Sequence, residues 1–328
     1  MIVGVILPHT LLYGGVKRFI EIGNRAVALG QRWIIFTPEG EPPSWVSFLG
    51  EVRPLASLGS QRLDALFTTE SCYVDDLIRA DTGLRIFYHV AQGHSLDKVL
   101  ASPKKITIFA NSTNIYNHDK KRYGIEPFKA VGAVDCALFS KGERRGNLDD
   151  VTIITYGRFY KKVKGTHLVV KTCERLHRRG FRIKLILFDT PPARKYRQRI
   201  NEFSCQLPFE FVLDHPVERN YELYKRADIF ASAEKIAGWA NTCAEAMASG
   251  LAVVATGAGT QDFLIHKKTG LKVWRNSFSL EWALGRLIKD IEMRKRLAEN
   301  GCNEIQKYDW SILTNRILEY IARFNSQS

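Results

Sequence analysis

The sequence predicts an α/β protein built from two doubly wound parallel sheets. Its 328 residues are about twice a typical domain length of roughly 150 residues, which indicates two domains. Short, nearly continuous apolar segments alternate with amphipathic stretches along the chain, a pattern typical of parallel strands that helices cover on both faces. Hydrophobic residues make up 45% and charged residues 25%, ordinary values for a globular chain that argue against disorder.

Ten segments have the composition of buried strands. They are Ile2–Leu7, Trp33–Thr37, Leu84–Val90, Ile106–Ala110, Val151–Tyr156, Ile183–Phe188, Phe209–Leu213, Asp228–Ala231, Leu251–Thr256 and Gly270–Val273. Two amphipathic stretches, Val16–Leu29 and Thr166–Arg179, are each followed by a glycine, which is a common helix terminator. The strands and helices therefore alternate twice over, as in doubly wound folds.

The boundary between the two domains is predicted near residue 148. The segment Ser140–Asp150 is rich in charge and glycine and has no hydrophobic period, and a new strand starts at Val151. We therefore expect one domain over residues 1–148 and a second over residues 149–307. Residues 308–328 form a last amphipathic helix.

The net charge of +14 is unevenly distributed. Up to residue 148 there are 18 Lys and Arg against 14 Asp and Glu, and after it 30 against 20. A basic second half favours an anionic partner such as a nucleotide, a nucleic acid or an acidic membrane surface, although exposed basic residues also serve solubility. Six widely spaced cysteines and the lack of a signal peptide or an apolar run of ~20 residues predict a cytoplasmic protein with free thiols.

Loops that lead from a strand into a helix are the places where ligands are expected, because ligands of open parallel sheets bind beyond the carboxyl ends of the strands. In the first half, Gly14 and Gly15 open a helix whose N–H groups could meet a phosphate or a sugar, or they form a plain tight turn. In the second half, Arg158 and Lys164 stand at either end of such a loop. A guanidinium and an ammonium there can neutralise a diphosphate.

Two further loops of the second half carry glycines before a helix. In the first, Glu245 could accept both hydroxyls of a ribose, or it could complete a capping box with Thr242. In the second, the backbone at Gly259 and Thr260 could hold a phosphate, or it could form a turn that needs positive φ angles.

Taken in order, these motifs resemble glycosyltransferase family 4. The stretches that carry the resemblance are Gly157-Arg158…Lys164-Gly165, Gly238-Trp239…Glu245…Gly250 and Gly259-Thr260…Asp262 in the second half, and Gly14-Gly15-Val16, Asn111-Ser112 and Gly132…Asp135…Phe139 in the first. The resemblance covers nearly the whole chain. It implies a GT-B fold with two Rossmann-like domains facing a cleft, a last helix that crosses back to the first domain, and retaining transfer of a hexosyl or deoxyhexosyl group.

The resemblance also implies roles for individual residues. Arg158 and Lys164 would hold the diphosphate of a UDP-, GDP- or TDP-sugar and stabilise the leaving group, and Glu245 would hold the ribose. Gln92 stands where the family often has a histidine that faces the sugar. The other donor-binding positions are Gly14, Gly15, Gly238, Trp239, Asn241, Thr242, Gly259 and Thr260. The resemblance implies that no metal or other cofactor is needed, and the lack of a D-x-D pair agrees with this. The acceptor would be a glycan or a lipid-linked molecule, which adds an anionic membrane surface at the inner face as an expected partner.

One departure from the family pattern concerns its first glutamate. The family usually shows two glutamates separated by seven residues, and counting back from Glu245 reaches Ala237 instead. Glu234 lies three residues further upstream. Either a longer loop brings Glu234 into the site, or the site has lost the first carboxylate. The sequence therefore leaves two hypotheses, a sugar-transferring enzyme with Glu234 in its site or a GT-B protein that binds a nucleotide or glycan without transfer. A nucleic-acid binder is disfavoured because the basic residues show no recognised motif.

Overall fold

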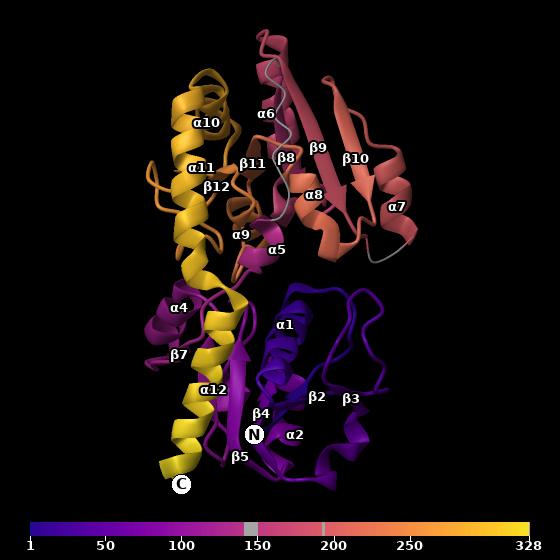
Figure 1. Cartoon of the computed structure of the whole chain (residues 1–328), viewed down its shortest axis with the longest axis vertical. Coiled ribbons are helices and arrows are strands. Elements are labelled where there is room, and N and C mark those ends of the chain that lie inside the picture. Colours follow the sequence, from indigo (N-terminus) through magenta and orange to yellow (C-terminus); the bar gives the residue numbers. More distant parts are fainter. Residues whose placement is uncertain (141–149, 192–193, 328) are drawn as a thin grey trace. The chain divides into compact units, whose positions relative to one another are not determined.

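The chain folds into two compact units, and the computed structural model describes residues 1–140, 150–191 and 194–327 (Figure 1). The first unit consists of Met1–Ala133 together with Tyr308–Ser328, and the second of Val134–Lys307. The change of unit therefore follows Ala133, and the boundary predicted near residue 148 is too late. The reason is that α5 (Cys136–Ser140) packs against α8 (Asn220–Tyr224) and α9 (Asn241–Ala248) of the second unit. Most of the charged segment behind that prediction lies outside the described residues.

The first unit contains a parallel sheet with the strand order β3-β2-β1-β4-β5-β6-β7. Its strands are β1 (Ile2–Ile6), β2 (Arg32–Thr37), β3 (Glu51–Pro54), β4 (Leu63–Thr68), β5 (Thr82–His89), β6 (Thr107–Ala110) and β7 (Phe128–Lys129). Its helices are α1 (Gly14–Ala28), α2 (Val74–Arg79), α3 (Asp97–Leu100), α4 (Thr113–Tyr123) and α12 (Trp310–Gln327). The strand order reverses between β1 and β4, as in doubly wound sheets.

The last helix belongs to the first unit, where it lies beside α1 (Figure 1). Its apolar face, which includes Trp310 and Ile317, is buried in the same core as Phe19 of α1 and Tyr88 of β5. Arg18 of α1 is also buried there. Its guanidinium donates a hydrogen bond of 2.9 Å to the Tyr88 hydroxyl and lies over the Tyr88 and Trp310 rings. This cation–π arrangement compensates a charge that is costly to bury and ties α12 to the sheet.

The second unit contains a parallel sheet with the order β10-β9-β8-β11-β12-β13. Its strands are β8 (Val151–Tyr156), β9 (Ile183–Asp189), β10 (Phe209–Leu213), β11 (Ile229–Ser232), β12 (Ala252–Ala255) and β13 (Leu271–Lys272). Besides α5, α8 and α9, its helices are α6 (Thr166–Arg178), α7 (Arg194–Asn201), α10 (Ser277–Lys289) and α11 (Ile291–Ile305). The order reverses between β8 and β11, which makes the carboxyl ends of these two strands the switch point of this sheet.

All ten predicted strands are present, and three further strands escaped the sequence analysis. In the interior strand β4, Asp64 interrupts the run of apolar residues. Its carboxylate accepts a hydrogen bond of 2.6 Å from the backbone N–H of Ile2. The edge strand β3 is partly exposed and ends in Pro54, and β7 has only two residues. A search for continuous apolar runs misses strands of these kinds because edge strands tolerate polar residues and proline.

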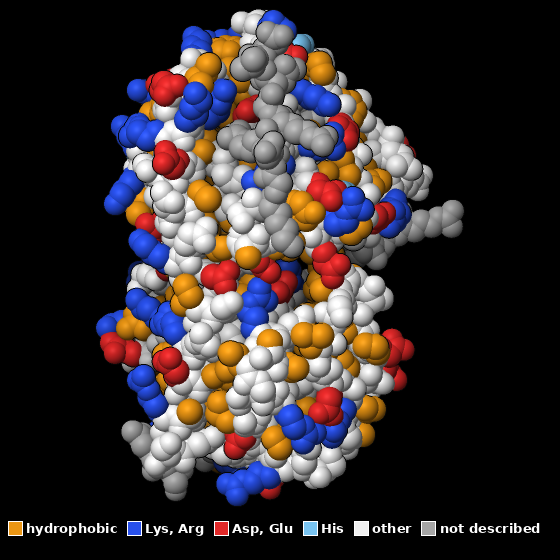
Figure 2. All heavy atoms as spheres, viewed as in Figure 1, with side chains coloured by type: hydrophobic (Ala, Val, Ile, Leu, Met, Phe, Trp, Pro, Cys, Tyr) orange, Lys and Arg blue, Asp and Glu red, His pale blue; other side chains and the backbone are white. Residues whose placement is uncertain are grey.

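Charged side chains cover much of the surface. Figure 2 shows Lys and Arg side chains interspersed with Asp and Glu over the visible face, instead of gathered in one continuous block. Among the residues that the structure describes, no helix combines the length and the apolar character that a membrane span requires.

The packing of α12 yields a paired prediction about stability. Ile317 is fully buried, whereas Ile312 on the same helix is 44% exposed. We expect Ile317→Ala to lower the free energy of unfolding by ~2–5 kcal/mol, because it leaves a cavity in the hydrophobic core of the first unit. Ile312→Ala should change it by less than ~1 kcal/mol. Urea unfolding followed by circular dichroism measures both, and equal effects of the two substitutions would contradict the packing described.

Candidate functional site

The candidate site lies at the carboxyl edge of the second sheet, around its switch point. Three loops meet there, one after β8, one after β11 and one after β12. They carry most of the second-half residues that the sequence analysis singled out.

Lys164 and Glu234 face each other across the switch point. Lys164 ends a short 3-10 helix, Lys162–Lys164, in the loop after β8, and Glu234 follows β11. The Lys164 Nζ lies 2.6 Å from Glu234 Oε1, and the glutamate is 7% exposed while the lysine side chain is 27% exposed. The ammonium is therefore reachable from solvent, while the carboxylate that balances its charge is nearly buried.

Arg158 is held by a second carboxylate, that of Asp189 at the end of β9. Its Nε and one terminal nitrogen donate to the same Asp189 oxygen at 3.2 and 3.0 Å, and that terminal nitrogen also donates to the Thr190 carbonyl. The Tyr160 hydroxyl donates to the other Asp189 oxygen at 2.7 Å. Burial and the hydrogen bond to Asp189 raise the pKa of Tyr160, so this hydroxyl stays protonated and keeps donating.

Tyr156, the last residue of β8, has both cations close to its ring. The Arg158 guanidinium is 5.0 Å from the centroid of its ring and the Lys164 Nζ is 5.8 Å from it. Burial, followed by the nearby Asp189 carboxylate, raises the pKa of Tyr156 well above its ordinary value. A neutral ring therefore presents its negative face to both cations.

The loops after β8 and β11 are locked to each other by close backbone approach. Gly165 has a φ of +71°, and a Cβ at this position would come within 2.0 Å of the Ala233 carbonyl oxygen, so only glycine fits. Arg275, just after β13, donates to the carbonyls of Ala233 and Lys162 at 2.9 and 2.5 Å. This bridge fixes the loops that carry Lys164 and Glu234.

The loops after β11 and β12 are likewise in contact. Gly259 has a φ of +68°, and an added Cβ would clash with the Ala240 nitrogen and with the Ala237 Cβ, which confirms that a turn with positive φ occurs here. Its carbonyl accepts a hydrogen bond of 2.9 Å from the Ala240 N–H. Gly238 is half-buried in this region, and Trp239 is 7% exposed with its ring packed on Phe263, 4.7 Å between centroids. Trp239 therefore supports the loop from within and does not present an open ring face.

Glu245 is 6% exposed and accepts a hydrogen bond of 3.0 Å from the Tyr224 hydroxyl. Burial and then the Glu245 charge raise the pKa of Tyr224 well above its ordinary value. The capping box suggested by Thr242 and Glu245 does not form, because α9 begins at Asn241 after the cap residue Ala240 and Thr242 is already its second residue. Glu245 consequently lies one turn into the helix.

The remaining second-half candidates are placed near these loops. Asn241 and Thr242 are the first, half-buried residues of α9. Thr260 is 1% exposed and its hydroxyl donates to the Thr256 carbonyl at 2.7 Å. Because this hydroxyl is used within the turn, Thr260 could bind a ligand only through its backbone groups.

The first-half candidates belong to the first unit. Gly14 and Gly15 begin α1, and a Cβ added at Gly15 would meet no described atom within 4 Å, so the start of this helix is open. Gln92 is exposed in the turn after β5.

A buried pair braces the turn that carries Gln92. His89 Nδ1 lies 2.9 Å from Asp119 Oδ1, with both side chains fully buried, and His89 Nε2 lies 2.7 Å from the Ala91 carbonyl. Because a carbonyl oxygen only accepts, Nε2 donates to Ala91, and this bond together with the contact to Asp119 fixes the orientation of the ring.

Two ion pairs, Lys164–Glu234 and Arg158–Asp189, therefore lie at the site. Sequence reasoning identified Arg158, Lys164 and Glu234, and the structure brings the last two together. It missed Asp189, Tyr160 and Arg275, although a carboxylate that ends a strand next to β8 is a signal that could have found Asp189. Across the described ranges, no group of three or more His, Cys, Asp and Glu is arranged to hold a metal ion.

Comparisons with known proteins identify a family. Residues 140–304, half of the chain, match the family model described as glycosyl transferases group 1. None of the curated proteins compared with the sequence matches it.

Several solved structures share the fold. Sucrose-phosphate synthase from Thermosynechococcus elongatus superimposes with a TM-score of 0.78 at 16% identity, covering 99% of both chains. A glycosyltransferase from Rickettsia africae gives 0.80 at 15% identity, again covering 99% of each chain. Anabaena HepE, solved in complex with UDP and glucose, gives 0.77 at 15% identity over 98% of this chain and 99% of its own.

The Arg158–Asp189 pair yields a prediction that separates buried from exposed ion pairs. We expect Asp189→Asn to destabilise the second unit by ~1–3 kcal/mol, because Arg158 and Tyr160 lose a charged acceptor. Asp150→Asn, which removes the exposed pair with Arg182 at the opposite end of β8 and β9, should cost less than ~1 kcal/mol. Chemical unfolding curves measure both, and equal costs would show that the Asp189 carboxylate is not a structural anchor.

Proposed function

Because the chain belongs to the glycosyl transferases group 1 family, we propose that it transfers a sugar from a nucleotide-diphosphate donor to a glycan or lipid-linked acceptor. It is a glycosyltransferase with the GT-B fold. The observation that carries the proposal is the placement of Lys164 and Arg158 at the switch point of the second sheet, each held by a carboxylate.

The donor diphosphate would bind to these two cations and would displace Glu234 from Lys164. Phosphate oxygens would accept hydrogen bonds from the Lys164 ammonium in the position that Glu234 now occupies, and from the terminal Arg158 nitrogen that does not contact Asp189. A diphosphate that leaves the sugar gains negative charge, and cations already in place stabilise it without further rearrangement. We propose that this pair supplies the neutralisation without a metal ion and that the anomeric configuration is retained.

Glu245 and Glu234 would then have different roles. Glu245 has a fixed orientation through Tyr224 and would accept from the ribose hydroxyls. Glu234, released from Lys164 by the incoming diphosphate, would face the donor sugar next to it. The UDP and glucose named for HepE make UDP-sugars the first donors to test, with GDP- and TDP-sugars next.

Ala237 supports a second candidate function, nucleotide-sugar binding without transfer. In the described structure the only acidic side chain of the segment from Ala233 to Ala240 is Glu234, and it is paired with Lys164. If that pair persists when the donor binds, the sugar meets no carboxylate from this loop.

The diphosphate assignment predicts the effect of removing each cation. Lys164→Ala and Arg158→Ala should each weaken UDP binding by ~1–3 kcal/mol, the scale of a lost charge-assisted hydrogen bond. Lys161→Ala, which removes an exposed cation from the same loop, should leave binding within about twofold. Isothermal titration calorimetry measures the affinities, with thermal unfolding to confirm that each variant folds. Unchanged affinity in both cation variants would remove this assignment.

The role of Glu234 can be separated from that of Ala237. Glu234→Gln frees Lys164 and should strengthen UDP binding about fivefold, ~1 kcal/mol, while it slows donor hydrolysis and transfer. The wild-type chain should turn over donor without help from a carboxylate at position 237. Turnover that appears only in Ala237→Glu would instead favour the binding-protein candidate. Both readouts come from one assay of nucleotide release with UDP-sugars.

A further inference from the structure

A group of aromatic and basic side chains on α10 and in the segment just before it has no role in the proposed reaction. Trp274, Phe278 and Trp282 are 81%, 82% and 45% exposed, unusual values for side chains of this size. The backbone N–H of Trp274 donates to the Ser279 hydroxyl at 3.0 Å, which places the Trp274 backbone against the first turn of α10. We call these three residues, together with Arg286 and Lys289, the α10 patch.

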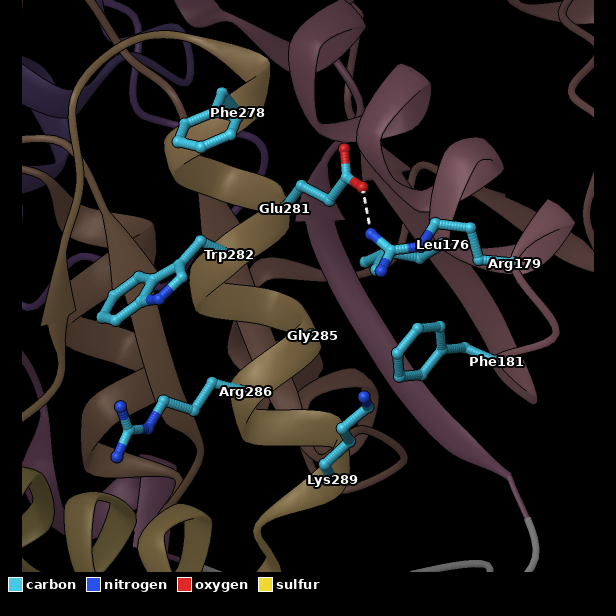
Figure 3. Close-up of a pocket in the computed structure, with 9 residues that line it drawn as sticks. All are labelled: Leu176, Arg179, Phe181, Phe278, Glu281, Trp282, Gly285, Arg286 and Lys289. Carbon is cyan, nitrogen blue, oxygen red and sulfur yellow. Dashed lines mark hydrogen bonds and ion pairs between the residues drawn. The ribbon is translucent and has the colours of Figure 1, made fainter.

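The patch borders a shallow hollow of about 420 Å³ on the face that α10 shares with α6. Phe278, Trp282 and Arg286 follow one side of α10, while Lys289 and Phe181 lie on the other (Figure 3). Gly285 lies between the two rows and lets the surface sink there. An apolar floor with rings on its rim is therefore open to solvent.

The cations of the patch lie over aromatic rings. The Arg286 guanidinium is 5.9 Å from the centroid of a Trp282 ring, and the Lys289 Nζ is 5.3 Å from that of Phe181. Such stems cover apolar surface while their charged heads stay in water. Arg286 and Lys289 are both exposed, so rings and positive charges share this surface.

The charge around the hollow is positive. Glu281 is the one acidic side chain among the residues that line the hollow, and two arginines share it. It lies 2.8 Å from Arg175. It lies 2.6 Å from Arg179, and Figure 3 marks this contact. One carboxylate therefore balances only part of four cations, Arg175, Arg179, Arg286 and Lys289. The partner that this surface fits combines negative charge with an apolar layer.

We propose that the α10 patch docks the second unit onto the surface of a bilayer that contains anionic lipids. Tryptophan and phenylalanine rings enter the boundary between headgroups and acyl chains, and Lys and Arg pair with anionic headgroups. A second copy of this chain fits less well, because a twofold contact would bring the cations of both copies together. The α10 patch is thus the surface through which the chain would bind the membrane.

An enzyme that uses a lipid-linked acceptor would meet it at such a surface. In this respect the inference rests on the proposed function and deepens it. Vesicle binding itself requires no turnover. A chain that binds vesicles but transfers no sugar, or one that releases nucleotide but ignores vesicles, therefore separates the failure of one proposal from the failure of the other.

The test is co-sedimentation of the full chain with phosphatidylcholine vesicles, with or without one third phosphatidylglycerol. We expect binding only to the anionic vesicles. Arg286→Ala with Lys289→Ala should weaken it about 25-fold, on the basis of ~1 kcal/mol for each basic residue near the surface. Trp274→Ser with Phe278→Ser should weaken it at least about tenfold.

A matched control removes the same charge elsewhere. Lys295→Ala with Arg296→Ala takes two exposed cations from α11 and should change binding by less than about twofold. Equal binding to both vesicle types, or an equal loss in the control and the patch variants, would overturn the proposal. So would a dimer in sedimentation velocity that Trp274→Ser with Phe278→Ser converts to monomer, because a second copy would then cover the patch.

Discussion

The ion pair between Lys164 and Glu234 is the interaction on which the site depends. It joins the loops that follow the two strands at the switch point of the second sheet, at 2.6 Å and with the carboxylate nearly buried. A carboxylate that is nearly buried in that position is stabilised by the ammonium that accompanies it. The backbone prepares the contact, since Gly165 allows the close approach to Ala233 and Arg275 bridges both loops.

The same principle recurs at Arg158, which is held by Asp189, and Tyr160 donates a hydrogen bond to the other oxygen of that carboxylate. A site whose cations are already balanced stays folded without its donor and keeps those cations oriented. The cost is that a diphosphate must compete with Glu234 for Lys164. The affinity for the nucleotide thus depends on how much more strongly the cations bind phosphate than carboxylate. This difference in free energy is small, so a single charge change can shift the affinity strongly.

Much of this organisation could be predicted from local sequence patterns, and the rest depends on contacts between distant segments. Apolar runs and glycine terminators identified both sheets, and strand–loop–helix transitions identified Arg158 and Lys164. Asp189 is 31 residues from Arg158, and Tyr224 is 21 residues from Glu245, so neither pairing leaves a local signal. The sequence could not choose between the capping box and another role for Glu245, because that choice depends on where α9 begins. The interior strand β4 escaped because Asp64 breaks its apolar run.

The most direct measurement of the central claim is a crystal structure of the chain with UDP bound. The account predicts a diphosphate within hydrogen-bonding distance of the Lys164 Nζ and the Arg158 guanidinium, with the Lys164–Glu234 contact lengthened beyond an ion pair. A diphosphate bound elsewhere on the chain, with both ion pairs of the site intact, would contradict it.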